Sequence, residues 1–228
     1  MPIKKPTIFQ VKNVEVIYKA EFSPPLLEVA LPETQARLLK DFCNKFGLRF
    51  REIVFNNQAI SSNLIYFRHP FRFGHFDTFI GVDELQTIFV NPETETLAWE
   101  LTTEIMDIIS KISKMIFKKQ TLTFNIHCSS EHIKYSEFMN NINTFNFTHK
   151  ITYSKGATFT IRSPLPGYLI NIIFDQSLLI ENGLFILMQV FLDESVQKYD
   201  DLFKNTISFL KRTIEPSFNM QINYEGRK

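Results

Sequence analysis

The chain has 228 residues, enough for one large domain or two small ones with a sizeable core. Hydrophobic residues (44%) and charged residues (21%) are in the range of globular proteins, and a formal net charge of +1 gives no overall field to attract nucleic acid or an anionic membrane. Residues 1–6 lack the apolar core of a signal peptide, and no apolar run approaches the roughly 20 residues of a membrane span, so we expect a soluble, cytoplasmic protein.

The first half of the chain predicts a strand, a helix, four strands and a long helix. Apolar alternation indicates the first strand, and proline and glycine mark the ends of the first helix. Helical spacing of apolar residues, starting near Thr94, indicates the long helix. The predicted elements are strand 13–22, helix 32–46, strands 49–56, 64–68, 76–80 and 85–90, and helix 94–115.

The second half predicts the same order of elements again. A cap at residues 129–131 opens its first helix, Lys155-Gly156 forms a hairpin turn, and Pro216 ends its last helix. The predicted elements are strand 121–128, a helix from about 131 to 145, strands 147–154, 157–162, 168–174 and 184–192, and helix 195–214.

A short turn sequence occurs after the third strand of both halves. Phe67 to Phe76 contains Arg68-His69-Pro70-Phe71, and Ile161 to Tyr168 contains Arg162-Ser163-Pro164-Leu165. A matching element order with a matching turn indicates an internal duplication. We therefore predict an α+β fold made of two repeated halves, 1–118 and 119–228, that share one curved antiparallel sheet with the helices on one face.

This arrangement resembles the TATA-box-binding protein family. Each half in that family also runs strand, helix, four strands, helix, with a basic and proline-containing turn at the corresponding place. The glycine-containing strand motifs and the basic charge of the family are absent here, so the resemblance implies a related fold only. The chain also faintly resembles bacterial proteins of similar length and unknown function, which start with a strand closing on Phe-x-Pro and end with a strand and an amphipathic helix.

No catalytic constellation is evident in the sequence. A Gly-x-Ser-x-Gly elbow and a glycine-rich phosphate loop are missing, and Cys128 and its neighbour His127 would point to opposite faces of a strand. His69, His75 and Asp77 have the spacing of a weak metal site, but ordinary strand-end histidines are the favoured interpretation. We predict a protein that is not an enzyme and needs no metal or cofactor, and we expect Cys43 and Cys128 to be reduced thiols.

The two turns are the candidate binding sites. Their candidate residues are Arg68, His69, Phe71, Arg72, Phe73 and His75 in the first turn, and Arg162 and Leu165 in the second. If the turns lie at opposite ends of the sheet, Phe71 and Leu165 could wedge between base steps while the arginines meet phosphates. The competing interpretation is that the phenylalanines plug the end of the core and the arginines extend to water.

The favoured function is binding of a protein partner, or homo-oligomerisation, through the sheet face and the two turns. Polar positions at alternate residues of the strands indicate such a surface, namely Glu15, Lys19, Asn125, His149, Thr158, Thr160 and Asn171. Two alternatives stay open: nucleic-acid binding through the same turns, and a small hydrophobic ligand carried in a cavity between helices and sheet.

Overall fold

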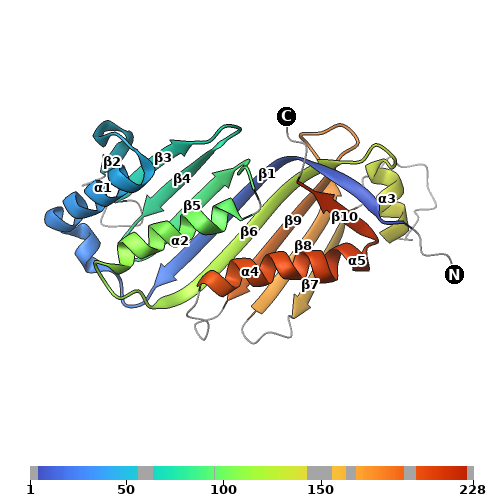
Figure 1. Ribbon diagram of the computed structural model, residues 1–228. Helices are drawn as coiled ribbons and strands as arrows, with labels where there is room; N and C mark the ends of the chain where they lie inside the picture. Colours follow the sequence, from blue (N-terminus) through green and yellow to red (C-terminus); the bar gives the residue numbers. More distant parts are fainter. Residues whose placement is uncertain are drawn as a thin grey trace.

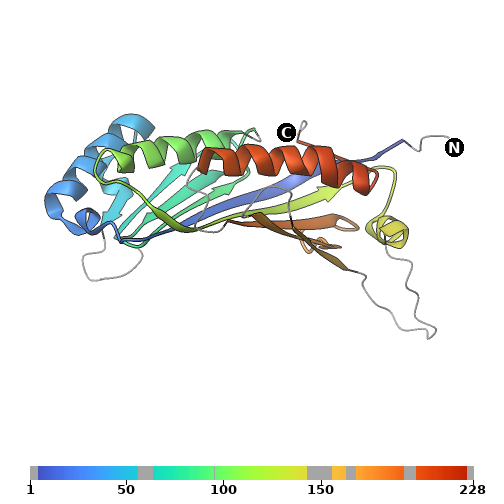
Figure 2. The same ribbon diagram turned by 90° about the horizontal axis from the view of Figure 1, so that it is seen from below.

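In a computed structural model, the described residues are 5–55, 64–94, 96–142, 156–162, 168–192 and 199–224, and they form an α+β protein with one curved, open sheet. Within these ranges the sheet is 10-stranded; most of the helices lie over one of its faces, and one short helix lies at the end of the sheet (Figures 1 and 2). A layer of helices over one sheet face buries the apolar side of each element against the other.

The sheet strands are β1 (Thr7–Phe22), β2 (Ile53–Phe55), β3 (Ile65–Pro70), β4 (His75–Ile80), β5 (Glu84–Val90), β6 (Phe117–Ser129), β7 (Ala157–Arg162), β8 (Tyr168–Gln176), β9 (Leu184–Leu192) and β10 (Met220–Asn223). The helices are α1 (Pro32–Phe46), α2 (Leu97–Ser110), α3 (Tyr135–Ile142), α4 (Tyr199–Phe209) and α5 (Glu215–Ser217), with a wide π turn at Leu210–Ile214.

The two long strands β1 and β6 lie side by side in the middle of the sheet. Among the described strands the order is β2-β3-β4-β5-β1-β6-β9-β8-β7, all antiparallel, and β10 pairs with β1 in parallel. The predicted boundary after residue 118 falls at the start of β6, so the two predicted halves contribute to one sheet.

A bulge in β1 changes which residues face the helices. Val11 is paired with Cys128 and Asn13 with His127, which leaves Lys12 as an extra residue. An extra residue reverses the alternation of side chains along a strand. Because of it, Val11 before the bulge and Val14 after it are both buried.

The core lies between the sheet and the helices. Phe67, Phe76 and Phe89 from the strands are 0% exposed. Phe46 of α1 contacts Phe67 and Phe76, with ring centroids 5.9 Å and 5.5 Å apart. At the other end, Phe138 of α3 packs on Phe9 and Phe174.

The first helix has the predicted boundaries for the predicted reasons. Pro32 occupies its first turn, where a missing N–H costs no hydrogen bond. Gly47 follows it with φ 63°, the left-handed conformation that glycine adopts without strain. Leu38, Phe42 and Phe46 form its buried side.

Several predicted boundaries are wrong. β2 starts at Ile53 instead of residue 49, because a 3-10 turn at Phe50–Glu52 precedes it, and residue 56 lies outside the described residues. α2 ends at Ser110 instead of residue 115, and Ile112 and Met115 pack on the core from the segment that leads into β6.

The end of the chain also differs from the prediction. Pro216 does not end the last helix, because the π turn ends before Glu215 and Pro216 falls in the first turn of α5. β10 was not predicted at all. The predicted strand 147–154 and most of the Lys155-Gly156 turn lie outside the described residues.

Candidate functional site

The face of the sheet opposite α1, α2, α4 and α5 is called the open face, and α3 lies at one end of the sheet (Figure 2). Strand pairing places alternate residues of neighbouring strands in rows across it. The open face consists of Tyr66, Arg68, His75, Asp77, Phe79, Glu84, Gln86, Ile88, Val90, Asn13, Glu15, Ile17, Lys19, Glu21, Thr121, Thr123, Asn125, His127, Phe185, Leu187, Gln189, Phe191, Leu169, Asn171, Ile173, Asp175, Thr158, Thr160 and Arg162.

Most charges on the open face are paired within it. The Lys19 ammonium lies 2.6 Å from the Glu84 carboxylate, and this hydrogen bond raises the pKa of Lys19. Lys118 reaches Glu21 at 4.0 Å, and Lys119 lies over the ring of Phe191 at 6.0 Å. The cations of this face are therefore largely engaged by its own acids and rings.

Arg68, the first candidate residue, is held by Asp77. Its Nε and Nη2 atoms donate to the two carboxylate oxygens, each at 2.7 Å, and the Tyr66 hydroxyl donates to Oδ1 at 3.1 Å. Burial alone would raise the pKa of Asp77, but the hydrogen bonds from Arg68 and Tyr66 outweigh it and lower that pKa. A bidentate pair of this kind leaves Arg68 less available to a phosphate.

His69 and Phe71 belong to the helix side rather than to the open face. His69 lies among the rings of Phe46, Phe71 and Phe76, and burial lowers its pKa. Phe71 packs on Phe76 with centroids 5.5 Å apart. The structure thus places Phe71 at the end of the core, which is the arrangement expected of a core plug and not of an intercalating wedge.

Arg72 and Phe73 form the tip of the β3–β4 turn. The Arg72 guanidinium stands over the Phe73 ring at 4.9 Å, and Phe73 is 42% exposed. Gly74 is required next to them, since a Cβ atom there would overlap the carbonyl oxygen of Val90. The turn is thereby held against the end of β5.

The second turn is only partly described. Arg162 is the exposed last residue of β7 and pairs with Leu169 of β8, so it belongs to the open face. Leu165 lies outside the described residues. β3 and β7 are separated by six strands of the order above, so Arg68 and Arg162 lie near opposite edges of the sheet.

The histidine spacing does not create a metal site. His69 faces the helices while His75 and Asp77 face the open side, with His75 Nε2 3.5 Å from Asp77 Oδ2. Throughout the described ranges, no group of three or more His, Cys, Asp or Glu side chains could hold a metal ion. Cys128 is buried on the helix side, where burial raises the pKa of its thiol, and His127 faces the other way, as expected.

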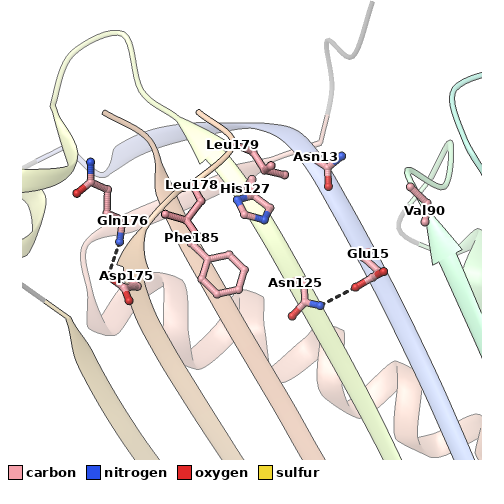
Figure 3. Close-up of a pocket in the computed structure, with 10 residues that line it drawn as sticks. All are labelled: Asn13, Glu15, Val90, Asn125, His127, Asp175, Gln176, Leu178, Leu179 and Phe185. Atoms are coloured by element: carbon pink, nitrogen blue, oxygen red, sulfur yellow. Dashed lines mark hydrogen bonds between the residues drawn. The ribbon is translucent and has the colours of Figure 1, made fainter. Parts of the chain in front are cut away.

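A hollow of about 680 Å³ lies at one end of the open face (Figure 3). It crosses β5, β1, β6, β9 and β8 and ends under the β8–β9 turn. Its lining residues are Asn13, Glu15, Val90, Asn125, His127, Asp175, Gln176, Leu178, Leu179 and Phe185. The volume is in the range of small-molecule pockets.

His127 is fixed in the hollow by the β8–β9 turn. The Ser177 hydroxyl oxygen accepts the N–H groups of Leu179 and Ile180, at 3.2 Å and 3.0 Å. Its own proton is then available to His127 Nδ1, 2.9 Å away. Burial lowers the pKa of His127, so the ring is neutral near pH 7 and carries its proton on Nε2.

Two carboxylates contribute to the lining. Asn125 Nδ2 donates to Glu15 Oε2 at 2.7 Å across the β1–β6 pair. Asp175 Oδ1 accepts the N–H of Gln176 at 2.7 Å and lies 3.5 Å from the Tyr135 hydroxyl. Figure 3 shows Glu15 and Asp175 on either side of Phe185 and His127.

The described helix–sheet interface near Ile207 offers much less space. A hollow lined by Val16, Phe124, Met188 and Ile207, among others, has about 10 Å³, close to the minimum for a single water molecule. This part of the helix–sheet interface does not favour a carried hydrophobic ligand.

Sequence reasoning identified part of the open face but not the hollow. The described positions from the predicted polar set, namely Glu15, Lys19, Asn125, Thr158, Thr160 and Asn171, share that face, whereas His149 lies outside the described residues. Asn13, Phe185, Leu178 and Leu179 were missed as site residues. The one available signal was the break in apolar alternation around Lys12, since bulges often adjoin functional sites.

The comparisons with known proteins give no match. No protein-family model, no curated protein and no solved structure matches this chain. Within the described ranges, no helix is long and apolar enough to span a membrane.

Proposed function

We propose that this chain is a non-enzymatic binding protein that docks a protein surface on the open face of its sheet, with the β3–β4 turn at the rim. The observation that carries the proposal is the composition of that face. Apolar side chains alternate on it with charges, most of which are already paired. The apolar side chains are Ile17, Phe79, Ile88, Val90, Leu169, Ile173, Phe185, Leu187 and Phe191.

The charge arrangement favours protein over nucleic acid as the partner. Binding to a phosphate backbone draws on several free Lys or Arg contacts. Here Lys19 and Arg68 are hydrogen-bonded to Glu84 and Asp77 of the same face. A partner surface that is itself apolar and near neutral fits this face better, because both surfaces then lose little solvation of charge.

The fold proposal goes with this function. We infer that residues 1–118 and 119–228 are duplicated halves of a fold related to the TATA-box-binding protein family. The strand order supports this, because β1 and β6 meet in the middle while β5-β4-β3 and β9-β8-β7 follow outward on either side. The open face of this sheet would then be the docking surface, and its partner would differ in chemistry from the partner of that family.

Affinity capture from the lysate of the source organism tests the proposal. The capture is run with and without nuclease, and light scattering of the purified chain measures self-association separately. A protein, or a second copy of the chain, that is retained at near-stoichiometric amount after nuclease treatment supports the proposal. If the captured proteins are lost on nuclease treatment, the result contradicts the proposal and favours nucleic acid as the partner.

Matched variants locate the contact. Ile88→Glu and Leu187→Glu place a charge in the middle of the open face, and we expect capture to fall about tenfold or more. Leu27→Glu is the control, since Leu27 is 68% exposed in the 3-10 turn before α1 and belongs to none of the strands of this face. Circular dichroism checks that all three variants fold, and equal capture by all three would place the contact elsewhere.

A further inference from the structure

The hollow is the part of the open face where carboxylate side chains have no Lys or Arg partner. Glu84, Glu21 and Asp77 each have a Lys or Arg partner. Among the described residues, no cationic group lies within 4.0 Å of Glu15 or Asp175, and none of the ten residues lining the hollow is Lys or Arg.

Aromatic and apolar groups complete the hollow. The Phe185 and His127 rings lie together with centroids 4.7 Å apart, between the two carboxylates. Leu178 and Leu179 on the turn above are 96% and 65% exposed. Carboxylates next to a ring face attract cations, and exposed leucines offer contact to a hydrocarbon body.

The remaining polar groups select against an anion. Glu15 accepts only one hydrogen bond from the described side chains, from Asn125, which leaves its other oxygen free to accept from a ligand. Burial lowers the pKa of His127, whose ring is oriented by Ser177, so the ring adds no positive charge near pH 7. An anionic ligand would meet two carboxylates with no compensating cation in the lining.

We propose that this hollow binds an organic cation, that is, an ammonium or guanidinium-type group on an apolar or aromatic body. Glu15 is the counter-ion, Phe185 stacks on the cation or its ring, and Leu178 and Leu179 cover the body. The cation is either a free small molecule or an Arg or Lys side chain of the docked protein. The second source rests on the function proposed above, and the first does not.

Calorimetric titration with three probes of one shape tests the charge requirement. The probes are benzamidine, which is a cation, benzamide, which is neutral, and benzoate, which is an anion. We expect benzamidine to bind at least tenfold more tightly than benzamide and benzoate to show no binding. Equal binding of benzamidine and benzamide, or no binding of any probe, overturns the proposal.

Two variants and a control assign the binding to the hollow. Glu15→Gln keeps an acceptor for Asn125 but removes the charge, and we expect benzamidine affinity to fall about tenfold or more. Phe185→Leu removes the ring and should weaken binding several-fold. Glu84→Gln makes the same chemical change at a paired acid of the same face and should leave the affinity unchanged. Equal affinity of the parent chain and Glu15→Gln overturns the assignment.

Peptide probes and native mass spectrometry separate the two sources. A capped Gly-Arg-Gly peptide that binds more tightly than its citrulline analogue indicates a side chain of a partner. An amine retained by the purified chain in native mass spectrometry indicates a free ligand. Either result supports the cation site, and partner capture by Glu15→Gln is measured in parallel. Failed probe binding with intact partner capture would remove this inference and leave the proposed function standing.

Discussion

The two faces of the sheet are built from alternate residues of the same strands, and they differ in what surrounds each side chain. On the helix face, Ile172 is 0% exposed and Phe174 packs on Phe138 and Phe159. On the open face, the neighbouring Ile173 is only half-buried, although strands flank it on both sides. Burial under the helices and partial exposure to solvent thus alternate between adjacent residues, so a substitution can be aimed at one face alone.

The most direct test of this comparison replaces adjacent isoleucines of β8. Ile172→Ala should lower the free energy of unfolding by about 2–5 kcal/mol, because it opens a cavity among helix-side residues that cannot collapse. Ile173→Ala should cost about 1 kcal/mol or less, because water already reaches that side chain. Urea unfolding at pH 7 measures both values.

An equal cost at the two positions would contradict the comparison. It would mean that Ile173 is covered in solution, for example by a second copy of the chain. Repeating the unfolding at several protein concentrations separates these cases, since the stability of a dimer rises with concentration.

Asp77 is the exception on the open face, because it is 6% exposed there. Asp77→Asn removes the charge that Arg68 and Tyr66 stabilise. We expect the melting temperature to fall by about 2–4 °C, a modest change because solvent screens the charge of the exposed Arg68. The pKa of Asp77 is lower in the folded chain than in the unfolded chain. Its stabilisation is therefore complete above about pH 4 and is lost as the pH falls through the folded pKa.

Urea unfolding between pH 7 and pH 3 measures this effect. The variant should lose less stability than the parent chain on acidification. Glu21→Gln is the control, because Glu21 and Lys118 form a longer and more exposed pair at 4.0 Å that should contribute little. A variant that follows the parent chain at every pH would show that Asp77 is not linked to folding.

The smallest expected effect concerns two half-buried histidines, one on each face. Burial lowers the pKa of both His69 and His127 relative to the unfolded chain. Their stabilising contribution is present above about pH 6.5 and is lost as the pH falls through the folded values. His69→Leu should flatten the fall in unfolding free energy between pH 7 and pH 5, and titration of both rings by NMR checks the cause. A ring that titrates at or above the ordinary value would contradict its burial.

The sequence predicted elements whose pattern is local. Alternation located β7 and β9 to the residue, and proline and glycine located α1. β1 was predicted to start at Asn13 rather than Thr7, because the bulge at Lys12 changes the phase of its apolar residues. β10 has four residues and forms only against β1, so its own pattern carries too little information.

The sites were harder to predict, because their members come from distant strands. The turn at residues 67–76 was singled out for its composition, but pairing across β3 and β4 divides it between the two faces. The hollow depends on the register of five strands and on the β8–β9 turn, where Ser177 orients His127. Residue spacing along the chain does not report such contacts.

The position of β1 has a consequence for how the chain acquires its structure. This strand precedes its partners in the sequence but lies in the middle of the sheet, and β5, β6 and β10 are separated from it by increasing lengths of chain. On the ribosome, residues 7–10 stay without β10 until residues 220–223 have emerged. Contacts between residues so distant in sequence make folding slow. Residues 7–10 therefore present an unpaired strand edge until β10 has been made, and an unpaired edge is prone to aggregation.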